Sequence, residues 1–275
     1  MCGGGDHSAV GIIDRRMGGN RDATPPAAPF GVRRAWRILR LSFGFRRDPA
    51  SFYRATSAAL ADVLAGFGMV RPGTRVLDAG SGTGALSEVL ASRALRVVAL
   101  DVADHRAREI ARTPFVLGLA ERLPFADGAF DGVISSNVLE HVRDPESMLL
   151  ELARACRPGG FVCVSWTNWL SPWGGHEMAP LHYLGPRLGM RAYRVLHGGK
   201  GPQENVPGRT LFVTHIGRFL RWLRRGDSGL RVVHVVPRYW PGLAFLARIP
   251  GVREVALWNC VIVLEKPTGA AGEPG

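Results

Sequence analysis

The run Asp78-Ala79-Gly80-Ser81-Gly82-Thr83-Gly84 has the residue types and the spacing of a turn that holds a small polar ligand. Glycines at 80, 82 and 84 permit positive φ angles and leave no Cβ between the backbone and a ligand. A buried strand pattern precedes the turn and a helix pattern follows it, so free N–H groups at the helix start would face the ligand. The turn also fits Gly-x-Gly-x-x-Gly/Ala, so nicotinamide chemistry is one possibility.

Asp101 is a second candidate for ligand binding, after the glycine turn. It ends the strand-like run 96–101. In parallel sheets, ligands bind beyond the carboxyl ends of the strands, where the strand order reverses. The glycine turn and Asp101 both follow strand ends, so we expect them to face the same ligand.

A third group of candidates lies in residues 167–230, a segment dense in Trp, Gly and Pro that breaks the strand–helix rhythm. We expect this insertion to overhang the ligand cleft, where a side chain could contact or deprotonate a second molecule. The alternative is a role in stabilising the loop. The candidates are His176, His182 and Tyr183.

The spacing of the cysteines argues against a metal site. The four cysteines show no C-x-x-C or other ligand spacing, and we expect no metal. Two of them fall in apolar strand-like runs and should pack as small buried hydrophobes. Cysteines used in this way indicate a reducing compartment.

The elements that position these residues alternate between strand and helix. Strand patterns occur directly before the glycine turn and at 96–101, 115–119, 131–135, 161–166, 232–236 and 258–264. This order predicts an α/β, Rossmann-like, doubly wound and mostly parallel seven-stranded sheet, with a helical and loop insertion after strand 5.

Four segments make up the expected organisation. Residues 1–30 and 267–275 have the composition of disordered tails. Residues 31–48 read as a basic amphipathic helix, a lid over the substrate or an anchor on an anionic membrane. Residues 49–266 form the main domain, with 167–230 as its substrate-covering insertion.

The charge balance is strongly basic. A net charge of +12 over 275 residues favours an acidic partner, although a genome rich in G and C also raises arginine content. Nucleic acid is disfavoured because the aromatic residues are not interleaved with the basic clusters. No apolar run approaches the roughly 20 residues of a membrane span. No secretory signal is visible. We therefore expect a cytoplasmic protein, with peripheral contact at an anionic membrane as an option.

A set of motifs in fixed order accompanies the glycine turn. It comprises the acid at 101, Leu123-Pro124-Phe125-Ala126-Asp127-Gly128-Ala129-Phe130-Asp131, Asn137-Val138-Leu139-Glu140-His141-Val142 and Arg157-Pro158-Gly159-Gly160. Over residues 50–166 the chain resembles class I S-adenosylmethionine-dependent methyltransferases, in particular the branch that includes ubiquinone and menaquinone methyltransferases.

The resemblance implies S-adenosylmethionine as cofactor and assigns roles around it. The glycines would approach its methionine part, Asp78 its ammonium group and Asp101 its ribose hydroxyls. Where family members have Asp-Ala, this chain has Ala120-Glu121, which leaves the Ala120 amide for the adenine and Glu121 in doubt. Asn137 would lie near the reactive methyl group, and Glu140 and His141 would be mainly structural. The expected cofactor-binding residues are Asp78, Gly80, Ser81, Gly82, Gly84, Asp101, Val102, Ala120, Glu121 and Asn137.

The resemblance implies methyl transfer by in-line displacement, which needs no metal. We expect a small, apolar acceptor, such as a lipid, a quinone-like molecule or a secondary metabolite. Tryptophans at 166, 169, 173, 222 and 240 suggest an aromatic wall for that acceptor. One alternative is a noncatalytic cofactor-binding protein that docks on anionic membrane or RNA. The other is a nicotinamide-dependent dehydrogenase. Neither the acceptor nor the oligomeric state is specified by these patterns.

Overall fold

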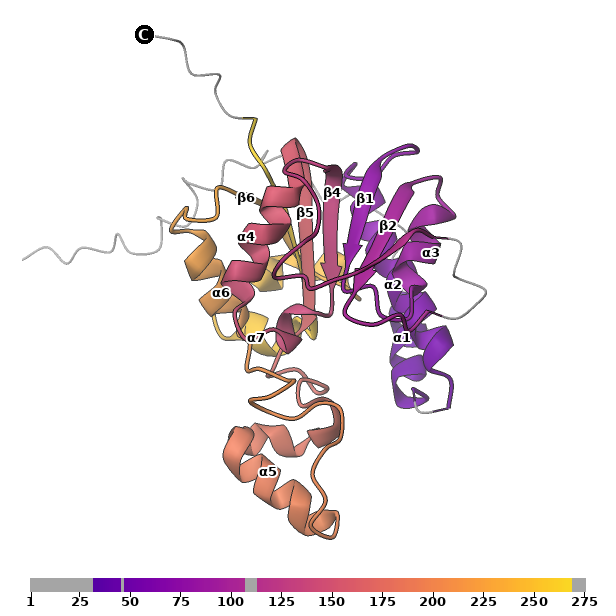
Figure 1. Ribbon diagram of the computed structural model, residues 1–275. Coiled ribbons are helices and arrows are strands. Elements are labelled where there is room, and N and C mark those ends of the chain that lie inside the picture. The colour runs from indigo at the N-terminus through magenta and orange to yellow at the C-terminus, as the bar shows by residue number, and fades with distance from the viewer. Residues whose placement is uncertain (1–31, 46, 107–112, 269–275) are drawn as a thin grey trace, which may run out of the picture.

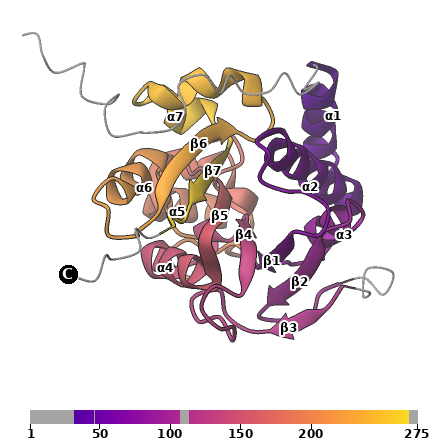
Figure 2. The same cartoon turned by 90° about the horizontal axis from the view of Figure 1, so that it is seen from above.

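The computed structural model describes residues 32–45, 47–106 and 113–268. Its centre is a seven-stranded sheet of order β3-β2-β1-β4-β5-β7-β6 (Figures 1 and 2). β7 runs antiparallel to both of its neighbours, and the other pairings are parallel. The strands are β1 (Arg75–Ala79), β2 (Arg96–Asp101), β3 (Phe115–Leu117), β4 (Phe130–Ser136), β5 (Cys156–Thr167), β6 (Arg231–Pro237) and β7 (Asn259–Glu265). The predicted fold class is confirmed.

Helices cover both faces of the sheet. On one face pack α2 (Pro49–Gly66) and α3 (Ala85–Ala91), and on the other α4 (Pro145–Ala155) and α6 (Ile216–Leu223) (Figure 2). The central strands are apolar on both sides and therefore bury side chains in two cores. Leu64 and Ile134 lie in the first core, and Leu77 and Met148 lie in the second. Burial of one such side chain contributes about 1.5–3 kcal/mol.

Two Asp-Pro pairs begin helices as their chemistry requires. Asp48 accepts a hydrogen bond from the Ser51 amide, and Asp144 accepts one from the Ser147 amide. The proline that follows each aspartate occupies the first turn, where its missing N–H has no partner to lose. Before α2 runs α1 (Val32–Phe43), which lies within the segment 31–48 predicted as an amphipathic helix and ends before that segment does.

The chain between β5 and β6 leaves the sheet as a separate arm (Figure 1). It contains η3 (His176–Met178), η4 (Leu181–Leu184) and α5 (Gly185–Leu196), and returns to the body before α6. The arm has a small core of its own, formed by Trp169, Met178 and Leu211. Since it begins where β5 ends, it lies on the carboxyl-end side of the sheet, which is where a ligand is expected.

Some boundaries differ from those predicted. β5 begins at Cys156, because Cys156 pairs with Phe130 of β4 before a register shift. The predicted strand at 115–119 is shorter and ends at Leu117. The disorder predicted for residues 1–30 lies outside the described residues, and so does that predicted for the tail 267–275 from residue 269 on. Within the described part of the chain, no helix combines the length and the apolar character needed to cross a membrane. The remaining helices are η2 (Leu139–His141), η5 (Pro241–Arg248) and α7 (Val252–Ala256).

Candidate active site

The glycine turn links β1 to α3 in a conformation that depends on glycine. The φ angles of Gly80, Gly82 and Gly84 are +82°, +52° and +79°. A Cβ on Gly80 would lie 2.2 Å from Cγ2 of Val138, so packing also requires glycine there. A Cβ on Gly82 would meet no atom within 4 Å. The turn is thus closed on the side of Gly80 and open at Gly82, where a ligand can approach the backbone.

Asp101 joins the end of β2 to this turn. Its Oδ2 accepts a hydrogen bond from the Gly82 amide at 2.7 Å, and its Oδ1 accepts one from the Val102 amide at 2.7 Å. A carboxylate offers about four acceptor positions, so two remain for hydroxyl groups. The Gly80 and Ser81 amides donate to the Leu100 carbonyl at 2.8 and 2.9 Å, which fixes the turn against β2.

Asp78 lies buried under the same turn. Its Oδ2 accepts a hydrogen bond from the Ser87 hydroxyl at 2.6 Å, while its Oδ1 has no hydrogen-bond partner among the described residues. Burial raises the pKa of Asp78 to about 6, the Ser87 hydrogen bond opposes the rise, and the nearby Asp101 adds to it. An orphaned carboxylate oxygen of this kind indicates a cationic or donor group that arrives with a ligand.

Asn137 follows β4 with a φ of +59°, which is uncommon outside glycine. Its amide donates to the Ser165 carbonyl at 2.7 Å. Its Oδ1 accepts hydrogen bonds from Asn259 Nδ2 at 2.8 Å and from Arg238 Nη1 at 3.3 Å. Backbone held in a sparsely populated region often marks a functional position.

The sequence reasoning missed Arg238 and Asn259. Arg238 is buried, and its Nε donates to the Thr56 carbonyl at 3.1 Å. Asp78 and Glu140 act on it electrostatically, which places a buried cation among the polar groups of the sheet edge. A polar or charged residue at the end of an otherwise apolar strand, such as Arg238 after β6, is the signal that could have drawn attention to it.

The two neighbouring residues predicted to contact the adenine differ in their exposure to solvent. Ala120 is buried, whereas Glu121 is exposed. An exposed side chain next to a buried alanine is consistent with recognition through the backbone, and the role of Glu121 stays a prediction.

The three catalytic candidates occupy different settings in the arm. His182 is fully buried, with its ring beside Trp169 and Tyr183 and its Nε2 3.1 Å from the Ser171 carbonyl. Tyr183 is exposed, and its hydroxyl donates to the Leu170 carbonyl at 3.4 Å. His176 instead faces the body, with its ring centroid 5.3 Å from that of His141. Of the three, His176 is the one in ring contact with a residue that follows β4.

Six of the seven tryptophans divide into two groups, and the seventh, Trp36 of α1, is exposed. Trp166, Trp169 and Trp222 are buried packing residues. Trp173, Trp240 and Trp258 form a half-buried cluster, in which the Trp258 ring centroid lies 5.0 Å from that of Trp173 and 4.9 Å from that of Trp240. The Phe43 ring of α1 lies 5.9 Å from that of Trp173. These three tryptophans and Phe43, the aromatic cluster, join α1, the arm and the segments just before η5 and β7.

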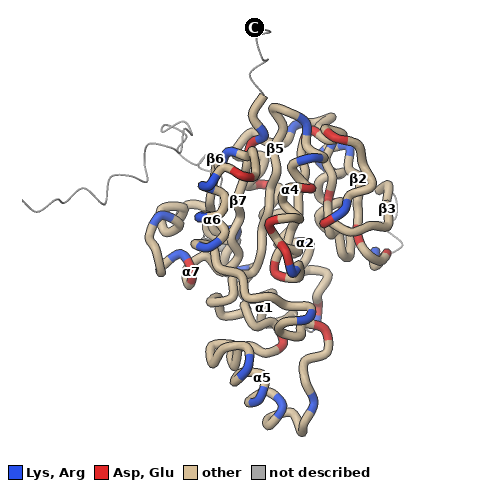
Figure 3. Tube along the Cα trace, turned by 60° about the vertical axis from the view of Figure 1, so that its left-hand side comes forward, with Lys and Arg blue, Asp and Glu red and all other residues tan. Residues whose placement is uncertain are grey.

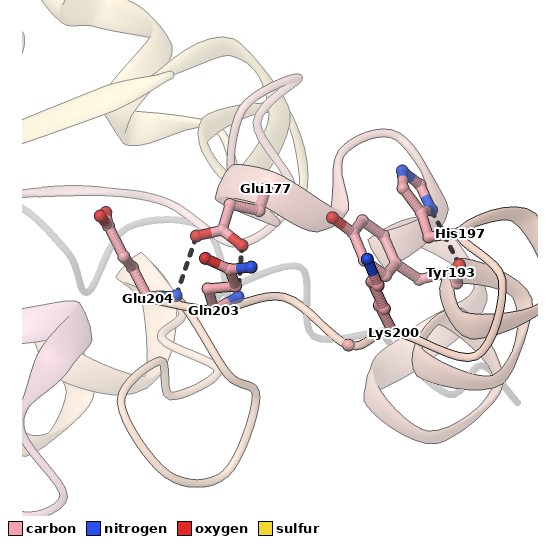
Figure 4. A pocket seen from close by; sticks show the side chains of 7 residues that line it. Glu177, Tyr193, His197, Lys200, Gln203 and Glu204 are labelled. Carbon is pink, nitrogen blue, oxygen red and sulfur yellow. Dashed lines mark hydrogen bonds between the residues drawn. The ribbon is translucent and has the colours of Figure 1, made fainter.

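A separate polar pocket lies within the arm, between η3, the end of α5 and the loop that follows (Figure 4). Glu177 accepts hydrogen bonds from the amides of Gln203 at 2.7 Å and Glu204 at 3.0 Å. Burial raises the pKa of Glu177, but the backbone donors outweigh it and the net pKa is lowered. Glu177 therefore fastens the loop as a carboxylate. None of the predicted cofactor residues lines this pocket.

The site fits the cofactor of the Rossmann-like methyltransferase class, and comparison with known proteins reaches the same class. A methyltransferase domain family matches residues 77–164. A methyltransferase of Mycobacterium sp. (strain JLS) is 37% identical over 242 residues, which covers 83% of this chain and 94% of the relative. A methyltransferase of Mycolicibacterium gilvum is 38% identical over 248 residues, which covers 84% of this chain and 94% of the relative.

Solved structures share the fold. A methyltransferase from Thermotoga maritima superimposes with a TM-score of 0.50 at 20% identity, over 84% of this chain and 99% of the other. The chain belongs to the class I S-adenosylmethionine-dependent methyltransferase family. The glycine turn is accordingly that of a methyltransferase and not that of a nicotinamide dehydrogenase.

Proposed function

We propose that the chain transfers a methyl group from S-adenosylmethionine to a small, apolar acceptor. The observation that carries this proposal is the buried Asp78 oxygen without a partner, next to a glycine turn that is open at Gly82. When bound, the cofactor supplies a positively charged sulfonium whose methyl group is open to nucleophilic attack.

The residues of the chain bind and orient the two reactants. Asp78 would pair with the ammonium group of the cofactor, and the two free acceptor positions of Asp101 would take the ribose hydroxyls. The amides of residues 80–84 would line the methionine part. Alignment of this kind can lower a barrier by roughly 7–11 kcal/mol.

The aromatic cluster supports an apolar acceptor. Its three tryptophan rings are half-buried, and with Phe43 they come from four separate parts of the chain, as expected of residues that line a site for a flat or aliphatic ligand. A lipid or a quinone-like molecule would suit such a wall, and a strongly charged acceptor would not.

Two measurements test the proposal. S-adenosylhomocysteine should raise the unfolding temperature of the chain, NADH should not, and Asp101→Ala should lose the response while the exposed Asp227→Asn keeps it. Incubation of cell extract fractions with radiolabelled S-adenosylmethionine should then label an organic-phase metabolite. Binding without any labelled product would favour the noncatalytic alternative, and a response to NADH would refute the cofactor assignment.

Peripheral contact with an anionic membrane belongs to the same proposal. α5 exposes Leu188, Val195 and Leu196 together with Arg187, Arg191 and Arg194. Figure 3 shows basic residues along this helix. Apolar side chains flanked by arginines suit the surface of an anionic bilayer. Replacement of the three arginines by glutamine should abolish sedimentation with anionic vesicles at low salt. Equal sedimentation of variant and wild type would refute the contact.

A further inference from the structure

The arm brings a third ligand-type side chain to Glu140 and His141. These two residues belong to η2, directly after β4, and His176 opens η3 in the arm. One potential ligand atom from each of the three residues lies within 4.8 Å of the others. None of the roles given above to Asp78, Asp101 or the glycine turn uses this cluster.

Each member of the η2 pair is oriented by the backbone. The Nδ1 of His141 lies 2.6 Å from the Thr210 carbonyl, which can only accept a hydrogen bond, so Nδ1 carries the hydrogen and the Nε2 lone pair is free. The Oε1 of Glu140 accepts a hydrogen bond from the Thr167 amide at 2.9 Å, which leaves Oε2 for another partner. Such outer contacts are the ones that orient the ligands of a metal ion.

Two polar atoms of these three residues are buried and unsatisfied. Among the described residues, neither Glu140 Oε2 nor His176 Nε2 has a hydrogen-bond partner. Buried polar atoms nearly always have one, so the pair calls for a group that both can bind. A cation satisfies a carboxylate oxygen and an imidazole lone pair at the same time.

We propose that Glu140, His141 and His176 bind one divalent transition-metal ion of the zinc type. Two imidazoles and one carboxylate form a ligand set of catalytic zinc, whereas Mg²⁺ prefers oxygen ligands alone. Tetrahedral zinc holds its ligand atoms about 3.4 Å apart, so side-chain shifts of about 1 Å complete the site. The sequence predicted no metal because the third ligand comes from a distant segment.

Three protein ligands leave a fourth position open. This consequence rests on the proposed function: an oxygen of the acceptor would bind there, on the same edge of the sheet as Asn137, and the ion would favour its deprotonated form. The acceptor would then carry a hydroxyl group, and its proton would leave to solvent.

The binding test uses the full chain and does not depend on methyl transfer. Protein freed of metal by a chelator is titrated with Zn²⁺, and with Co²⁺ as a spectroscopic probe, by calorimetry and thermal unfolding. One ion per chain should bind and raise the unfolding temperature. His176→Ala and Glu140→Gln should weaken binding at least about 10-fold. His197→Ala, which removes an exposed histidine of the same arm, should leave it unchanged.

Controls separate a lost site from a lost fold. Circular dichroism must show that the variants are folded, and His176→Asn provides a second, less disruptive replacement. Absence of binding by the wild type would overturn the metal site, as would equal affinity in folded His176 variants. Extract labelling that survives both chelation and His176→Ala would overturn the role in catalysis and leave the cofactor assignment intact.

Discussion

Asp78 offers the sharpest test of the cofactor site, because its buried carboxylate should destabilise the protein when no ligand is bound. Its pKa is about 6, against an ordinary value of 3.8. Each pKa unit corresponds to about 1.4 kcal/mol, so ionisation of Asp78 should destabilise the unliganded protein by about 3 kcal/mol at pH 7. Asp78→Asn removes this charge and can still accept the Ser87 hydrogen bond.

The sign of the pH dependence follows from the raised pKa. Between about pH 4 and pH 6 the folded chain holds a proton on Asp78 that the unfolded chain has released. The contribution of Asp78 to the free energy of unfolding is therefore greatest below pH 4, falls as the pH rises to 6, and is constant above. Asp78→Asn should lack this fall and should unfold about 6–12 °C higher at pH 7.

Cofactor binding should respond in the opposite direction. The ammonium group needs an ionised Asp78, so the affinity for S-adenosylhomocysteine should drop about 10-fold per pH unit below 6 and level off above it. In Asp78→Asn the affinity should be weaker and should lose this slope.

Calorimetric titration and urea unfolding between pH 4.5 and 8 measure both effects. The exposed Asp227→Asn serves as the control and should change neither. A variant that is no more stable than the wild type at pH 7, or that binds with an unchanged pH slope, would refute the assigned role of Asp78.

Three further predictions concern the turn, the ribose site and the acceptor wall. Gly80→Ala should lower the free energy of unfolding by about 2–5 kcal/mol in urea titrations, because its Cβ would meet Val138 at a φ of +82°. Gly82→Ala should cost only about 1 kcal/mol yet still weaken S-adenosylhomocysteine binding. Asp101→Asn should weaken that binding about 10- to 100-fold by calorimetry, since an amide cannot accept from both backbone donors and two hydroxyls. Trp173→Ala should leave cofactor binding unchanged and lower the labelling of the acceptor about 10-fold, and a lowered cofactor affinity would contradict its place in the wall.

The parts of the fold that were predictable are those encoded by neighbouring residues. The runs that became β1 and β2 are mainly apolar, and the Asp-Pro pairs at 48 and 144 specify helix starts through local contacts. The start of β5 was not predictable, because Cys156 is a strand residue only through its pairing with Phe130.

The same distinction applies to the site. The glycine turn, Asp78 and Asp101 could be proposed from sequence because the strands that carry them are consecutive along the chain. Arg238 is one of many arginines, and it becomes buried only when β6 and β7 bring it to Asn137. The approach of His176 to Glu140 depends on how the arm folds back, which no local pattern encodes.

The separate core of the arm affects which amino-acid substitutions the fold can tolerate. Trp169, Met178 and Leu211 pack with one another and belong to neither of the two cores of the sheet. Substitutions within the arm can therefore accumulate with little effect on the strands that carry Asp78 and Asp101. We expect an arm exchanged between two relatives to leave cofactor binding intact, because Asp78 and Asp101 lie outside it, and to carry with it the part of the acceptor preference that Trp173 contributes.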